Sequence, residues 1–311
     1  MARLKRKFEP DEILNYIFLS LLSVIQIIYA SQINGWYLFI TANFIICILI
    51  YFIIGIFAKK KENNSQLKKS SVISIIRFWY GIPVVLYCFK QVYHIIQGMN
   101  LPLIDLTLIK IDYLLFGVNP TEWMMNFANP FVTEVLQVIY FYYYLLFIFF
   151  FLEFHLKRNS DEYKFSMFVI LLGFYISYIF YLIFPAAGPR FFIHDFFSIS
   201  KELPGIFLTE PARIFLNFGE SIPAGVSNPL LHVQKDAMPS AHVSMAFLVL
   251  YLSWRFKTKS VWFYLPYFIL MAVSTIYLRY HYVVDVLAGV TVGLLAILLT
   301  KLFYRDETQL D

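Results

Sequence analysis

Charged residues are scarce in this chain of 311 residues, and that scarcity excludes an ordinary soluble domain. Charged side chains make up 14% of the sequence and hydrophobic residues 60%, whereas soluble domains average about 25% charged residues. The mean hydropathy is +0.67. A composition this apolar indicates an integral membrane protein.

Cysteine is also rare, and the sequence contains two, Cys47 and Cys88. They fall in separate apolar runs and lack the close spacing of metal ligands, so we expect both to be small core residues.

The net charge of +5 arises from lysines and arginines in short clusters between apolar runs. Clusters so placed set membrane topology, and we expect no nucleic-acid partner.

Long apolar runs predict an all-α, polytopic membrane helix bundle with about eight transmembrane helices. The runs fall at about residues 13–33, 36–58, 71–97, 131–155, 165–184, 240–256, 261–279 and 282–303. We expect one membrane domain over 1–311, comprising N-terminal helices (1–97), an interfacial segment (98–130) and a catalytic core (131–303). The interfacial segment mixes apolar residues with acidic ones, which favours a packing or capping helix along the membrane surface.

The basic clusters predict which side of the membrane each loop occupies. They lie at about residues 3–7, 59–69, 157–158, 255–259 and 301–305, after every second span. The positive-inside rule then places both termini in the cytoplasm. The loop over about 185–239 and the corner at 279–281 would lie on the extracytoplasmic face, so that face collects the residues considered next.

His281 and Asp285 are four residues apart, so they share one face if both belong to a helix. The carboxylate could then accept the proton of one ring nitrogen and leave the other as the lone pair that a nucleophile needs. The alternative is a buried polar pair that only joins two helices. The cost of a carboxylate at a span end favours the functional interpretation.

A second histidine, His242, follows Pro239-Ser240 at the start of another span. Proline suits the first turn of a helix, and the N–H groups at that end attract anions, so Ser240 is expected to help hold a phosphate. His242 could protonate a departing oxygen. Its alternative role is a core histidine bonded to a backbone carbonyl.

Two arginines complete the candidate site. Arg190 follows Gly188-Pro189, and Arg279 lies just before His281. A guanidinium matches phosphate oxygens with two parallel hydrogen bonds, so both are candidate phosphate ligands. Taken singly, each could instead extend toward the membrane interface.

These motifs resemble the type 2 phosphatidic acid phosphatase (PAP2) superfamily, in particular its branch of inositol phosphorylceramide synthases and related bacterial membrane proteins. The resemblance covers about residues 165–303 and consists of Gly188-Pro189-Arg190, Pro239-Ser240-Ala241-His242 and the segment from Ser274 to Asp285, in the family's order. Residues 111–117 suggest the family's upstream region as well. The resemblance implies a six-helix core with an extracytoplasmic active site.

The resemblance also implies a role for each site residue. His281 would attack phosphorus and become a phosphohistidine, Asp285 would orient it, and His242 would protonate the leaving group. Arg190, Ser240 and Arg279 would bind the phosphate oxygens. No metal and no cofactor are implied.

Two positions depart from the best-known phosphatase pattern. Ile183 stands where the family has a lysine seven residues before the arginine of the first motif, and Thr275 stands where it has an arginine. Similar departures occur in the synthase-like branch.

The sequence therefore predicts a membrane enzyme whose partner is a lipid substrate, a lipid phosphate or phospholipid, with ceramide or an inositol lipid as a candidate acceptor. It would transfer a phosphoryl or phospho-headgroup unit to an alcohol, as an inositol phosphorylceramide synthase does. Transfer to water is the alternative, as in a lipid phosphate or polyprenyl diphosphate phosphatase. A non-catalytic lipid-phosphate carrier and a metal-dependent hydrolase stay open as further alternatives.

Overall fold

The computed structural model describes residues 8–62, 72–157 and 160–304, and in these ranges the chain is all-helical. Its longer helices are α1 (Pro10–Ile28), α2 (Trp36–Glu62), α4 (Gly81–Met99), α7 (Pro130–Phe141), α8 (Tyr143–Lys157), α9 (Ser160–Ile183), α13 (Ala241–Arg255), α14 (Val261–Tyr277) and α15 (Val283–Phe303). The short α3 (Val72–Trp79) precedes α4. The prediction of an all-α membrane bundle is thus confirmed.

The number of spans is smaller than predicted when it is judged by length and composition. In the described part of the chain, α1, α2, α9 and α15 are long and apolar enough to cross a membrane, and α7 with α8 makes a fifth candidate bent by 49°. Helix α14 has 17 residues and α13 has 15, against the roughly 20 that a span needs. The expected count of eight is not confirmed.

The predicted topology rests on basic residues, and most of them lie outside the part of the chain whose side chains the structure describes. The basic residues at 3–7, 59–61, 68–69, 157–158 and 305 are outside that part of the structure. Sidedness therefore stays a prediction.

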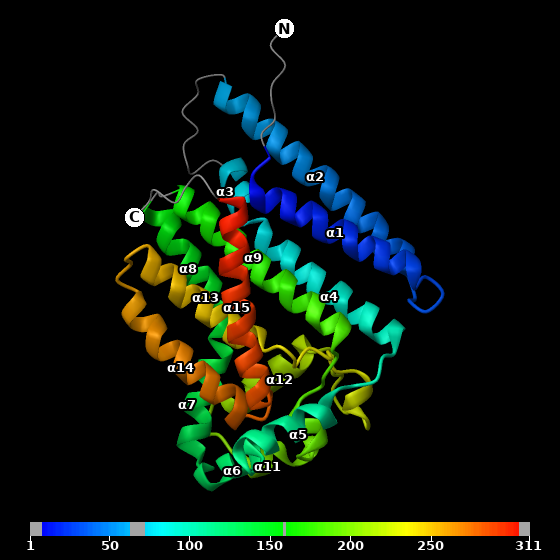
Figure 1. Ribbon diagram of the computed structural model, residues 1–311, viewed down its shortest axis with the longest axis vertical. Helices are drawn as coiled ribbons and strands as arrows, with labels where there is room; N and C mark the ends of the chain where they lie inside the picture. The colour runs from blue at the N-terminus through cyan, green and yellow to red at the C-terminus, as the bar shows by residue number, and fades with distance from the viewer. Residues whose placement is uncertain (1–7, 63–71, 158–159, 305–311) are drawn as a thin grey trace.

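The short helices α5, α6 and α11 lie together at one end of the bundle, opposite α3 (Figure 1). The predicted interfacial segment forms α5 (Asp105–Phe116), α6 (Pro120–Trp123) and η1 (Met124–Phe127). The long loop after α9 forms α10 (Pro189–Phe192), η2 (Phe196–Ser198), α11 (Ile199–Glu202), α12 (Thr209–Gly219) and η3 (Pro229–Leu231). Helix α15 starts at this end and α1 at the other (Figure 1).

The core of the bundle is built around α9 and α13. Helix α13 packs against α9, α14 and α15, and 83% of the apolar window in α9 is buried. A Cβ added at Gly289 of α15 would lie 2.5 Å from the backbone oxygen of Ser240, so only a glycine allows this approach. The contact joins the start of α13 to the start of α15.

The N-terminal helices are joined by buried amides. Gln26 of α1 and Asn43 of α2 each donate to the Gln91 Oε1 of α4 at 3.0 Å, and Gln91 donates back to Asn43 at 2.9 Å. Between apolar helices such bonds supply the specific attraction that burial of hydrocarbon against lipid does not.

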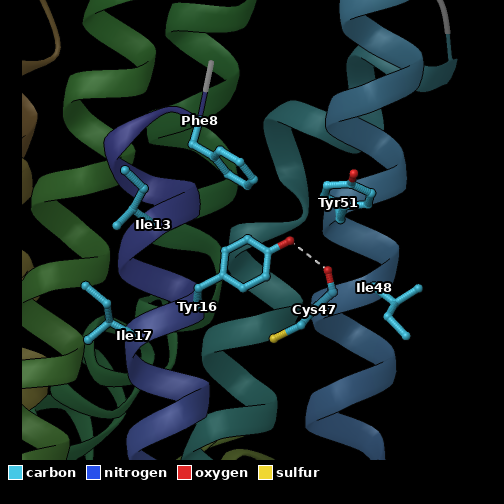
Figure 2. Close-up of a pocket in the computed structure, with 7 residues that line it drawn as sticks. All are labelled: Phe8, Ile13, Tyr16, Ile17, Cys47, Ile48 and Tyr51. Carbon is cyan, nitrogen blue, oxygen red and sulfur yellow. Dashed lines mark hydrogen bonds between the residues drawn. The ribbon is translucent and has the colours of Figure 1, made fainter. Parts of the chain in front are cut away.

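A groove of about 490 Å³ lies between α1 and α2 (Figure 2). Its walls include Phe8, Ile13 and Ile17, and Tyr16 donates a hydrogen bond to the Cys47 carbonyl at 2.7 Å. The described residues around the groove are apolar or weakly polar.

Replacement of Gly289 by alanine tests the α13–α15 contact. The new Cβ would meet the rigid Ser240 backbone, so we expect a loss of about 1–3 kcal/mol in stability. Gly293→Ala is the matched control in the same helix, since its Cβ would meet the Phe247 ring, which can rotate. Thermal unfolding in detergent measures both, and equal losses would contradict the close approach.

Candidate active site

Two carboxylates of α5 hold the backbone of the candidate site. Asp105 accepts hydrogen bonds from the N–H groups of Ala187 and Gly188 at 3.0 and 2.8 Å, and from the Tyr282 hydroxyl at 3.0 Å. Burial raises the pKa of Asp105, and these hydrogen bonds oppose the rise. One buried side chain thus fixes the first motif against the third.

The second carboxylate caps the helix that carries Asp285 of the predicted pair. Asp112 accepts from the N–H groups of Val283 and Val284 at 2.8 and 2.9 Å. These groups belong to the first turn of α15, where backbone donors lack partners within the helix. Asp112 therefore stabilises the start of α15, and the surface position predicted for the segment over 98–130 stays a prediction.

The first and third motifs also touch through their backbones. Gly188 has a φ of +96°, and a Cβ there would lie 2.5 Å from the Tyr280 oxygen. The next contact runs from the Arg190 N–H to the Arg279 oxygen at 3.1 Å. Glycine is required at this position both for the conformation and for the space.

His281 lies in the tight corner between α14 and α15. Its N–H and that of Tyr280 donate to the Thr275 oxygen at 3.1 and 3.0 Å. Its Nδ1 lies 2.8 Å from the Ala237 oxygen, which fixes the proton on Nδ1 and leaves Nε2 as the lone pair. Burial lowers the pKa of His281 to about 4, so the imidazole is neutral near pH 7.

Asp285 lies farther from His281 than its spacing predicts. Its Oδ2 lies 3.6 Å from His281 Nδ1, whereas the Ala237 carbonyl lies closer. The same Oδ2 accepts the N–H of Tyr282 at 2.9 Å, because Asp285 occupies the third position of α15 and completes a capping box. The other oxygen, Oδ1, is buried and has no hydrogen-bond partner among the described residues.

Ser240 is the N-cap of α13. The Ser240 hydroxyl accepts a hydrogen bond from the Val243 N–H at 3.4 Å. The backbone N–H of Ser240 donates to the backbone carbonyl oxygen of Asp285 at 3.0 Å. Ser240 is fully buried. The structure therefore places Ser240 at the N-terminus of α13, and its phosphate contact stays a prediction.

His242 faces His281, with a distance of 5.8 Å between ring centroids. Its Nδ1 lies 3.4 Å from the Tyr140 hydroxyl, and its Nε2 is buried without a hydrogen-bond partner in the described part of the chain. The Tyr140 ring stacks on it at 4.4 Å. A buried nitrogen with no partner is costly unless a ligand supplies one.

Arg190 joins the same group through aromatic rings. Its Cζ lies 4.8 Å from the centroid of Tyr280, which stacks on Tyr140 at 4.5 Å. Its Nη2 lies 2.7 Å from Glu220, and Nη1 donates to Asn217 at 3.3 Å. Burial lowers the pKa of Arg190, but neighbouring charges led by Glu220 raise it above its ordinary value.

Arg279 lies apart from the other candidates. It is fully buried and adopts a φ of +67°. Its guanidinium pairs with Glu202 of α11 at 2.5 Å and contacts Met125. The structure brings its backbone to Arg190 but directs its side chain to these other partners.

Several residues that support the site were missed by sequence reasoning. They are Asp105, Tyr140, Asn217, Glu220, Ala237 and Tyr280. Asn217 and Glu220 are three apart near the end of α12, so a polar stripe in the long loop was a signal for them. The Ala237 carbonyl has no side-chain signal at all.

A family model described as the PAP2 superfamily matches residues 107–299, which is more than half of the chain. The chain belongs to the PAP2 superfamily. Members are generally phosphatases or phosphotransferases that act on lipid phosphates, and this membership supports the same reaction class here. Neither the curated proteins nor the solved structures contain a match to the chain.

The PAP2 match includes most of α5, the long loop and all three motifs, so it contains Asp112 and begins two residues after Asp105. Of the two positions that depart from the phosphatase pattern, Ile183 is 55% exposed at the end of α9, and Thr275 is buried.

No described group of three or more His, Cys, Asp and Glu residues has the arrangement of a metal site.

Exchange of Asp105 for asparagine should loosen the PAP2 site. Asparagine would direct an NH₂ group toward N–H donors, and each lost bond to a charged acceptor is worth about 1.5–3 kcal/mol. We expect a loss of about 2 kcal/mol or more by thermal unfolding in detergent. Tyr282→Phe is the matched comparison, because it removes one of the three donors and should cost less; an equal or greater loss there would contradict the assignment.

Proposed function

We propose that this PAP2 protein transfers a phosphoryl or phospho-headgroup unit from a membrane lipid through a phosphohistidine on His281. The observation that supports this most strongly is the hydrogen bond from His281 Nδ1 to the Ala237 carbonyl, which leaves Nε2 free as a nucleophile. The buried Nε2 of His242 across the site is the second support.

In the first step, His281 Nε2 attacks phosphorus and the bond from phosphorus to the leaving oxygen breaks. His242, protonated when the anionic phosphate enters, donates its proton to that oxygen. Arg190 and the N-terminus of α13 at Ser240 stabilise the negative charge on the other phosphate oxygens. The lipid alcohol departs, and the phosphorus stays bonded to His281.

In the second step, a hydroxyl group attacks phosphorus and the bond to His281 breaks. His242 takes the proton of that hydroxyl and returns to its starting state. Water gives hydrolysis, whereas a lipid alcohol gives transfer. The sequence resemblance to the inositol phosphorylceramide synthase branch favours transfer to an alcohol, and neither step uses a metal.

The same proposal includes the arrangement in the membrane. Eight helical segments cross or enter the bilayer, both termini are cytoplasmic, and the site lies on the extracytoplasmic face. Its support is the alternation of basic clusters along the sequence and the position of α5, α6 and α11 at one end of the bundle (Figure 1).

Removal of the nucleophile tests the mechanism directly. His281→Ala should lower turnover by about a thousandfold or more, because no other group forms the covalent intermediate. Wild-type protein quenched during turnover of a ³²P-labelled lipid phosphate should carry acid-labile, base-stable label, which the variant lacks. His232→Ala, which changes a histidine of the long loop after α9, is the control and should keep normal turnover. Near-normal rates in His281→Ala would sink the proposal.

A second experiment separates transfer from hydrolysis. Purified protein in detergent and EDTA, given phosphatidylinositol labelled in its head group and ceramide, should form a labelled sphingolipid. Chromatography would resolve this product from released head-group phosphate. Release alone would indicate hydrolysis, loss of turnover specifically on chelation would indicate a metal-dependent hydrolase, and lipid binding without turnover would indicate a carrier.

A further inference from the structure

A cavity of about 220 Å³ lies beside Arg190, on the side of α12. Its polar walls are Arg190, Ser200, Glu210, Arg213, Asn217 and Tyr280, and Phe196, Phe197 and Leu278 are among its apolar walls. One water occupies about 30 Å³ of liquid, so the space exceeds that of a structural water several-fold. It can hold a small polar group.

Helix α12 supplies one wall of this cavity and is firmly attached. Arg213 and Asn217 are four apart and share one helical face. The N-terminus of α12 is held by Glu134 of α7, which accepts from the N–H groups of Ile206 and Leu208 at 2.8 and 2.5 Å. The polar face of α12 is thus built into the fold.

Each guanidinium in the cavity already has a carboxylate partner. Arg190 pairs with Glu220 at 2.7 Å, and Arg213 pairs with Glu210 at 3.0 Å while donating to the Leu203 carbonyl at 2.7 Å. The two carboxylates balance the two positive charges, so a second phosphate would meet repulsion as well as attraction. Hydroxyl groups donate and accept, and they match walls that do both.

The cavity shares Arg190 with the proposed reaction site. Arg190 lines the cavity and lies over Tyr280, whose ring stacks on Tyr140 beside His242. Because the proposed mechanism has Arg190 contact the phosphate on His281, a group bonded to that phosphate would lie next to the cavity. The apolar walls suit the C–H faces of a polyol.

We propose that this cavity binds the hydroxyl-rich part of a phospholipid head group and that Arg213 determines specificity for such head groups over a bare phosphate. The inference rests on the proposed function, whose chemistry at His281 is unchanged. Arg213 lies outside the three motifs, and it contacts the head group rather than the reacting phosphorus.

The test compares kcat/KM for phosphatidylinositol with that for phosphatidate of the same acyl chains. Arg213→Met should lower this ratio roughly tenfold, because hydrogen bonds from a charged donor are lost for one lipid and not the other. Lys201→Met on the neighbouring α11 is the matched control and should leave the ratio unchanged, since Lys201 does not line the cavity. An unchanged ratio in Arg213→Met would overturn the inference.

A measurement on the wild-type protein covers the case in which the variant fails to fold. Inositol 1-phosphate should inhibit phosphatidate turnover at a concentration roughly tenfold lower than inorganic phosphate does. Equal inhibition by the two would overturn the inference. If the wild type turns over neither lipid, the proposed function itself fails, so the two failures are distinguishable.

Discussion

The hydrogen bonds from two α5 carboxylates to backbone N–H groups are the constraint on which the rest of the site depends. Asp105 binds the first motif and Tyr282 of the third, and Asp112 caps the first turn of α15. A carboxylate can satisfy several donors at once, and unsatisfied buried N–H groups are costly. Two side chains from outside the motifs therefore determine how Gly188, Arg190 and His281 meet.

Close backbone contacts then carry this constraint to the reacting groups. Gly188 approaches the backbone oxygen of Tyr280. The backbone oxygen of Thr275 accepts the N–H of His281, and the backbone N–H of Ser240 donates to the backbone oxygen of Asp285. None of these contacts depends on a flexible side chain. The distance between His242 and His281 is thus set by the packing of α13 against α15, which the glycine at 289 permits.

The sequence could predict those parts of the site that repeat at short spacing. His281 with Asp285 follows from the four-residue spacing of a helical face, and Ser240 with His242 follows from their position at the start of an apolar run. The partners of Arg190 are 27 and 30 residues away from it, and the spacing of polar residues in the long loop does not reveal which distant arginine they contact. The side chain of Arg279 also depends on a distant partner, Glu202.

The position of Asp285 is best understood through the charge that the proposed reaction creates. Before attack, His281 is neutral, and a neutral carbonyl at 2.8 Å is sufficient to orient it. After attack, the ring bears phosphorus on one nitrogen and a proton on the other, so it becomes positive. A carboxylate oxygen 3.6 Å from Nδ1 then gains attraction that was absent in the ground state. An interaction that is weak before attack and strong after it lowers the reaction barrier rather than tightening substrate binding. This explains why the closer partner of His281 is the Ala237 carbonyl and the more distant one is the Asp285 carboxylate.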